Sequence, residues 1–139
     1  MSVKQLLDFY GDFYRDFNRK AAEEMLTHLN IRLTQRIKQM SKGTREKVQL
    51  ILVMSRKAKL YLLDEPMNGL DPLAVIEMRA ALRHLAATGA IVVVSSHLLH
   101  ELSLVCDKAY MLIDGSCFEV TDVEHLESVY VEHAAAYAR

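Results

Sequence analysis

The stretch Leu60-Tyr61-Leu62-Leu63-Asp64-Glu65-Pro66 is the most informative part of the sequence, because a short apolar run ends there in two adjacent carboxylates. Four consecutive apolar residues between polar ones are typical of a strand that is buried on both faces. Asp64 and Glu65 then stand at the carboxyl end of that strand. In open α/β sheets, binding and catalytic groups gather at this edge. The stretch therefore predicts a strand of an α/β sheet with a functional site at its end.

Two further apolar runs, 91–94 and 109–113, follow the first at distances that leave room for helices in between. The first gap carries clear helix signals, with Asp71 as N-cap, Pro72 at the first helical position and Gly89 just past the end. This alternation of strands and helices predicts an α/β layer with right-handed crossovers. Because the runs are apolar on both faces, we expect both faces of the sheet to be covered.

The residues before the first strand have a helical pattern. Ser2 is expected to cap one helix, Asp16 or Asn18 to start a second, and Ser41 to cap a third. An aromatic stripe at helical spacing is more often core than a ligand platform, so we expect it to be buried; it consists of Phe9, Phe13 and Phe17.

We divide the chain into two parts after residue 58. Residues 1–58 are expected to form a helical subdomain. Residues 59–139 are expected to form one half of an α/β core, with an amphipathic helix over 122–139 that packs on the body.

Composition excludes several classes of protein. Of the 139 residues, 51% are apolar and 25% are charged, which argues against a disordered chain. The formal net charge is −1, so no overall field attracts the protein to nucleic acid. Two cysteines do not make a disulfide scaffold, and the apolar runs are too short to span a bilayer. These features predict a soluble, intracellular protein with no nucleic-acid partner.

The charges are nevertheless unevenly distributed. Between Arg32 and Lys59 there are nine basic residues and a single acidic one, Glu46. Such a stretch indicates either a surface that meets phosphate or an ordinary solvated helix face, and charge alone does not choose between them.

The pair Asp64 and Glu65 suits phosphoryl-transfer chemistry. A carboxylate at this edge can hold Mg²⁺, which proteins often bind through one or two carboxylates together with substrate phosphates. The neighbouring carboxylate can orient and deprotonate a water for attack on a phosphoryl group. The alternative is a structural turn at the strand end, in which Asp64 caps the loop.

Three other segments favour the phosphoryl-transfer interpretation. The loop 68–72 follows the carboxylates at once, and Ser95-Ser96-His97 ends the second strand at the same sheet edge. Upstream, Ser41 and Gly43 open a helix within the basic stretch. A helix N-terminus is a ready site for an anion, and a glycine there lets a ligand approach the backbone.

With these residues, the sequence resembles the ATP-binding domains of ABC transporters, and among them the ABC-2-type exporters. Four ordered segments resemble the family's signature, Walker B, D-loop and H-loop: 40–44, 62–66, 69–72 and 95–97. The resemblance implies a partial P-loop NTPase-type parallel sheet, the half that carries Walker B, preceded by an α-helical subdomain.

The resemblance also implies a role for each residue at a matching position. Asp64 would bind Mg²⁺, Glu65 would be the general base, and His97 would sense the γ-phosphate of ATP. Ser41 and Gly43 would contact an ATP that is held by the opposite subunit. Asp71 would carry signals across that interface.

Implied partners are a second ATP-binding cassette, in a homo- or heterodimer, and a transmembrane permease subunit. The implied location is the cytoplasmic face of the cell membrane, held there by the permease.

The sequence departs from the family pattern in two respects. The signature has other residues at three positions: Met40 for Leu, Lys42 for Gly and Thr44 for Gln. In addition, these 139 residues contain neither a G-x-x-x-x-G-K-[ST] Walker A loop nor the family's Q-loop. The chain therefore corresponds to the C-terminal part of a cassette. Without the neighbouring Walker A strand, an apolar strand edge is expected to stay open.

The expected function is that of a partial ATP-hydrolysing subunit, which couples ATP hydrolysis to export across the membrane. The missing Walker A loop argues against hydrolysis by these residues alone. Two alternatives remain: a non-catalytic module that donates its signature to a partner cassette, and an inactive truncated fragment.

Overall fold

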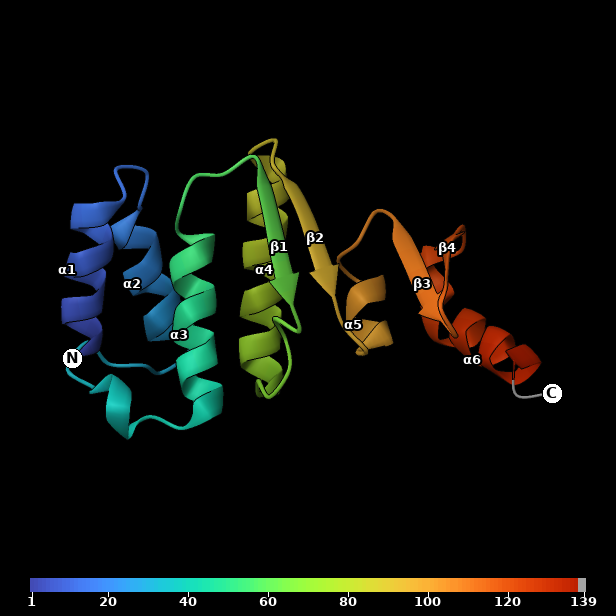
Figure 1. Ribbon diagram of the computed structural model, residues 1–139, viewed down its shortest axis with the longest axis horizontal. Coiled ribbons are helices and arrows are strands. Elements are labelled where there is room, and N and C mark those ends of the chain that lie inside the picture. Colours follow the sequence, from blue (N-terminus) through green and yellow to red (C-terminus); the bar gives the residue numbers. More distant parts are fainter. Residues whose placement is uncertain (138–139) are drawn as a thin grey trace. The chain divides into compact units, whose positions relative to one another are not determined.

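The computed structural model describes residues 1–137, which divide into two compact units, one over Met1–Ser95 and a second that begins at Ser96. The fold is mixed α/β with a small parallel sheet in the first unit, as the sequence predicts (Figure 1). The predicted boundary after residue 58 lies inside the first unit, between the last of three helices and the first strand. Each unit is described by itself.

Three helices begin the first unit: α1 (Val3–Phe13), α2 (Arg19–His28) and α3 (Lys42–Met54), with a 3₁₀ turn (Ile37–Gln39) before the third. Their starts lie where the sequence places them. Ser2 caps α1 in a reciprocal capping box with Gln5, Asn18 caps α2, and Ser41 caps α3. Side-chain caps thus set the helix starts.

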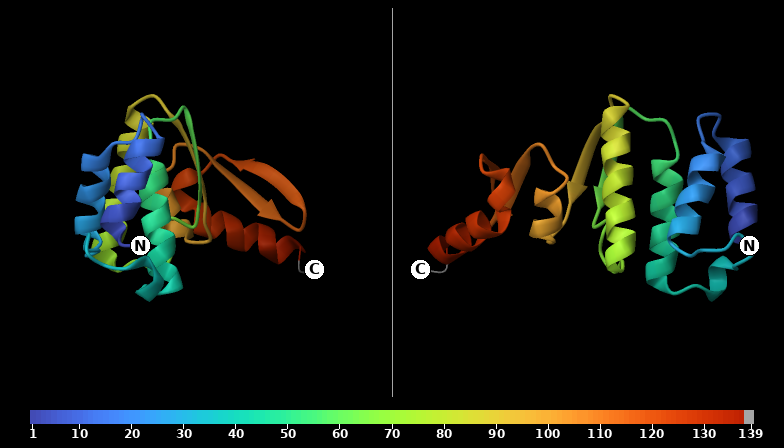
Figure 2. Two further views of the ribbon diagram at one scale, coloured as in Figure 1. Left: turned by 60° about the vertical axis from the view of Figure 1, so that its left-hand side comes forward. Right: turned by 180° about the vertical axis from the view of Figure 1, so that it is seen from behind.

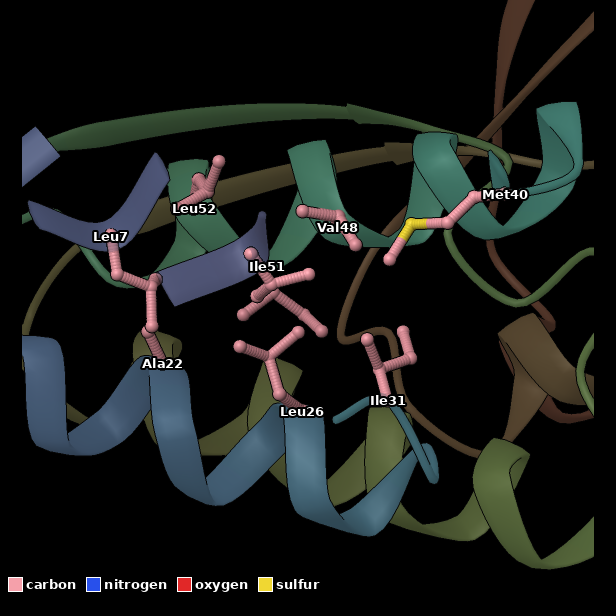
Figure 3. Close-up of a cluster of buried hydrophobic side chains, with 9 residues drawn as sticks. Leu7, Ala22, Leu26, Ile31, Met40, Val48, Ile51 and Leu52 are labelled. Atoms are coloured by element: carbon pink, nitrogen blue, oxygen red, sulfur yellow. The ribbon is translucent and has the colours of Figure 1, made fainter. Parts of the chain in front are cut away.

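The core of this helical part lies between α1, α2 and α3 (Figure 3). The connection before the 3₁₀ turn contributes Ile31, and its backbone pairs with the start of α1 through the amides of Val3 and Lys4. The buried side chains come from the three helices and from the segment between α2 and α3, and are Val3, Leu7, Ala22, Leu26, Ile31, Met40, Val48, Ile51 and Leu52.

The aromatic stripe is only partly buried, so the prediction for it was wrong at two of three positions. Phe9 is 53% exposed and Phe13 is 67% exposed, with their rings stacked 5.8 Å apart. The buried face of α1 is set by Val3 and Leu7, and Phe9 lies about 200° around the helix from Leu7. Only Phe17, beyond the end of α1, packs against the core.

Strands β1 (Leu60–Asp64) and β2 (Ile91–Ser95) form a parallel pair, joined by helix α4 (Pro72–Ala87). Asp71 caps α4, because its carboxylate accepts a hydrogen bond from the Ala74 amide at 2.8 Å. Figure 2 shows α4 lying along one face of the pair. The register runs from Leu60 opposite Ile91 to Asp64 opposite Ser95.

The other face of the β1–β2 pair is exposed, so the expectation that both faces are covered was wrong for the described residues. Tyr61 and Leu63 are buried, whereas the side chains that alternate with them lie outside. Leu62, for example, is 69% exposed. We call this surface the open sheet face; it consists of Leu60, Leu62, Ile91 and Val93.

The second unit contains α5 (Leu99–Ser103), an antiparallel hairpin of β3 (Ala109–Ile113) and β4 (Ser116–Val120), a 3₁₀ turn (Val123–His125) and α6 (Leu126–Tyr137). The third predicted strand therefore exists but pairs in a hairpin, not in the parallel sheet. Its turn is Asp114-Gly115, with φ angles of 50° and 78°, which suits a tight hairpin turn.

The predicted C-terminal helix over 122–139 is present as α6 only from Leu126 to Tyr137, because Val123–His125 form a 3₁₀ turn before it; its last two predicted residues, 138–139, lie outside the described part. Leu126 is buried against Met111 and Val120 of the hairpin.

Candidate functional site

The candidate site is built at the carboxyl end of β1, where the parallel register brings Asp64 beside Ser95. The Ser95 hydroxyl donates a hydrogen bond to the Asp64 carboxylate. The backbone amide of Glu65 donates to the Ser95 carbonyl oxygen at 2.7 Å. Two polar side chains and the backbone of the second carboxylate residue are thus fixed at one sheet edge, as the strand pattern predicts.

The backbone turns sharply at Glu65, which has a φ angle of 49°. A left-handed conformation is unusual for a residue other than glycine and is held here by surrounding contacts. The Asn68 amide donates to the Glu65 carbonyl oxygen at 3.2 Å and closes a turn over 65–68. Pro66 and Met67, between them, are buried. This turn directs the chain away from the sheet edge and positions Glu65, which is half-buried.

A cavity of about 450 Å³ lies between α3 and this strand end. Its lining includes both carboxylates and the half-buried Lys47 of α3. The Lys47 ammonium donates a hydrogen bond to the carbonyl oxygen of Asn68. Burial lowers the pKa of Lys47, while the negative charges of Glu46 and Glu65 act in the opposite direction. Lys47 thus belongs electrostatically to the same site as Glu65.

Sequence reasoning missed Lys47 as a member of the site. It was counted only as one of nine bases in the stretch from Arg32 to Lys59. A signal was present, because Lys47 precedes the apolar residues Leu50 and Met54 by three and seven positions and so shares their helix face.

The N-terminus of α3 presents the predicted pair Ser41 and Gly43. The Ser41 hydroxyl accepts from the Thr44 amide at 3.2 Å and lies 2.9 Å from the Thr44 hydroxyl. Ser41 and Gly43 are both exposed, and a Cβ placed on Gly43 would meet nothing within 4 Å. No packing contact within the described residues explains a glycine here, so its backbone is open to approach from outside.

The remaining predicted site residues are Asp71 and His97. Asp71 is exposed and serves as the cap of α4. His97 is exposed and belongs to the second unit, two residues past the end of β2. The structure therefore brings together Asp64, Glu65 and Ser95, and the meeting of His97 with Glu65 stays a prediction.

The donor set at the strand end fits Mg²⁺. Asp64 and Ser95 offer hard oxygen atoms, and Mg²⁺ in phosphoryl-transfer sites takes its other ligands from phosphates and water. Within residues 1–137, no group of three or more His, Cys, Asp or Glu side chains could hold a metal by itself. In the same residues, no helix is both long and apolar enough to cross a membrane.

Comparison with known families gives one match over most of the chain. Residues 3–103 match a family described as "AAA domain, putative AbiEii toxin, Type IV TA system". The matched range contains the end of β1 with its carboxylates and the N-terminus of α3.

Similar curated proteins are ATP-binding proteins of ABC transporters. The "Uncharacterized ABC transporter ATP-binding protein YcbN" of Bacillus subtilis is 28% identical over 96% of this chain and 44% of its own length. The "Lipopolysaccharide export system ATP-binding protein LptB" of Escherichia coli is 30% identical over 94% of this chain and 56% of its own length. The chain therefore spans about half the length of these relatives.

Among solved structures, one described as "Structure of ATP binding subunit of ABC transporter" superposes with a TM-score of 0.76. It is 25% identical, and the match covers 95% of this chain and 62% of that one. The fold is therefore that of a P-loop NTPase cassette, present in part.

Proposed function

The chain belongs to the AAA domain family as part of an ABC transporter ATP-binding protein, and from this premise we propose that it contributes to ATP hydrolysis that drives export across a membrane. The observation that carries the proposal is the end of β1, where Asp64 is bonded to Ser95 and the backbone turns at Glu65. Paired oxygen groups at a strand end suit phosphoryl transfer.

In this proposal, the residues of the strand end act on an ATP bound beside them. Asp64 holds Mg²⁺, which would neutralise charge on the phosphates when bound. Glu65 orients a water and accepts its proton, because its carboxylate follows directly after the metal-binding residue. His97 hydrogen-bonds the γ-phosphate. Support comes from the fixed positions of Asp64 and of the Glu65 backbone.

The N-terminus of α3 acts on a different ATP, which is held by a second cassette. The Ser41 hydroxyl, the open backbone at Gly43 and the helix dipole would together receive the γ-phosphate. Asp71 would lie at the interface between the two cassettes. A homo- or heterodimer at the cytoplasmic face of a permease, with no nucleic acid, completes the proposal.

A second candidate function is a non-catalytic module that only donates its signature helix. The open N-terminus of α3 favours this candidate, because donating the signature requires no other part of the chain. The 139 residues contain no phosphate-binding loop of the G-x-x-x-x-G-K-[ST] type, so an ATP beside Asp64 would have to be held by another segment.

Mixing this chain with a complete cassette relative tests both candidates. We expect the chain to stimulate phosphate release by the complete cassette. Ser41→Arg should abolish the stimulation, because a bulky side chain would stand where phosphate approaches, and Ser116→Arg on the exposed hairpin is the matched control. Absence of stimulation by the wild-type chain would contradict the proposed function.

Glu65→Gln distinguishes the candidates in the same mixture. If the chain only donates its signature, Glu65→Gln should barely change phosphate release. If it is as damaging as Ser41→Arg, the strand-end site of this chain is itself hydrolysing ATP.

A further inference from the structure

Lys47 differs from the other bases near the start of α3. Lys42 and Arg45 are exposed, whereas Lys47 is half-buried and lines the cavity that also contains Glu65. Bringing a lysine out of water has a cost in free energy that is recovered only through a specific contact. The contact that the structure shows is the hydrogen bond from its ammonium group to the carbonyl oxygen of Asn68.

The backbone of Asn68 links Lys47 to Glu65 through two hydrogen bonds. Its carbonyl oxygen accepts from the Lys47 ammonium, and its amide donates to the carbonyl oxygen of Glu65 at 3.2 Å. The two groups flank the Cα of Asn68 and belong to adjacent peptide units, so anchoring the carbonyl to α3 restrains the residue whose amide closes the turn. The contact from α3 therefore supports the turn that follows the left-handed backbone of Glu65.

We propose that Lys47 is a positioning residue, which fixes the turn 65–68 to α3 through the Asn68 carbonyl and so sets where the Glu65 carboxylate stands. The inference rests on the proposed function for the role of Glu65, but not for the contact itself. Lys47 lies six residues after Ser41, about 9 Å along the helix axis. One rigid helix therefore carries both the end that would meet a partner's ATP and the cation that supports Glu65.

Hydrogen exchange on the 139-residue chain tests the contact. Lys47→Met should speed the exchange of amides in 65–71 roughly tenfold, because one of the two bonds that order the turn is lost. Lys47→Arg should restore protection, since it also supplies a cationic donor. Lys57→Met removes an exposed lysine of the same unit and should change nothing. Asn68→Ala should also behave as wild type, because the acceptor is a backbone carbonyl.

Two results of the exchange experiment would overturn the proposal. One is unchanged exchange of 65–71 in Lys47→Met. The other is failure of Lys47→Arg to restore protection, because a cationic donor at position 47 would then not be what orders the turn.

Turnover by a complete cassette tests the positioning role. The cassette is made by joining the part of Escherichia coli LptB that this chain does not match to all 139 residues. Lys47→Met should lower kcat roughly tenfold and leave KM for ATP within about twofold, because a misplaced group impairs chemistry more than binding. Lys47→Arg should recover most of kcat.

The outcomes separate this inference from the proposed function. If Glu65→Gln abolishes turnover but Lys47→Met does not lower kcat, the positioning role is wrong. If Glu65→Gln leaves turnover intact, the proposed role of Glu65 is wrong and the positioning role fails with it, whatever hydrogen exchange shows for the contact.

Discussion

Two glycines lie within helices where the structure gives no internal reason for them. A Cβ on Gly43 in α3, or on Gly11 in α1, would meet nothing within 4 Å. Alanine in a helix interior is favoured over glycine by about 1 kcal/mol, and by less in the first turn. We therefore expect Gly11→Ala to raise the free energy of unfolding by about 1 kcal/mol and Gly43→Ala by roughly half of that.

The two variants should differ in function. Gly43→Ala should weaken the stimulation of a complete cassette, because a methyl group obstructs the backbone that meets phosphate, whereas Gly11→Ala should leave it unchanged. Urea denaturation measures stability, and phosphate release measures stimulation. Full stimulation by Gly43→Ala would show that the open backbone at this position is not used.

At the residue scale, the sequence was most informative about caps and least about contacts between distant segments. Ser41 and Asp71 could be identified because a polar residue before a helical pattern has one common role. The contact of Lys47 with Asn68 joins residues 21 positions apart and could not be read from either neighbourhood. The left-handed backbone of Glu65 also carries no local signal, because a glutamate rarely adopts it.

At the scale of elements, the open sheet face makes a prediction about association. Two strands expose four large apolar side chains on one surface, with Leu62 the most exposed. Such surfaces favour self-association. The double variant Leu62→Thr, Val93→Thr should shift the chain toward monomer in light scattering and lower the melting temperature little, because both side chains are largely outside the core.

The buried neighbour Leu63 provides the contrast. Leu63→Thr should destabilise the fold strongly, because a buried leucine loses contacts and a hydroxyl enters the core. If the wild-type chain is already a monodisperse monomer with a cooperative melt at high temperature, the open sheet face does not drive association.

The strands also show which features of the sheet could be predicted from the sequence. Apolar runs placed β1, β2 and β3 correctly, because period and length identify a strand. They did not identify the strand that pairs with β3, since the apolar pattern of a strand carries no information about which strand it pairs with. The turn Asp114-Gly115 was the available signal for the hairpin with β4.

For the whole molecule, we expect the 139-residue chain to bind Mg-ATP much more weakly than a complete cassette and to show no measurable turnover. Asp64 and Glu65 occupy one side of a phosphate-binding site, and positioning of the γ-phosphate supplies much of such catalysis. Calorimetry with Mg-ATP and a phosphate-release assay measure the two quantities. Robust hydrolysis that Glu65→Gln abolishes would contradict this expectation.

At position 65, the carboxylate that the proposed chemistry needs and the stability of the fold favour different residues. A residue other than glycine in this conformation costs the folded state about 1 kcal/mol, a noticeable share of the small net stability of a domain. Glycine or asparagine would fit the turn better. Laboratory evolution that selects for thermostability alone would therefore enrich glycine or asparagine at position 65. The resulting proteins would be more thermostable but would lack the carboxylate. Engineers who wish to stabilise this cassette should hold position 65 constant and look for improvement elsewhere.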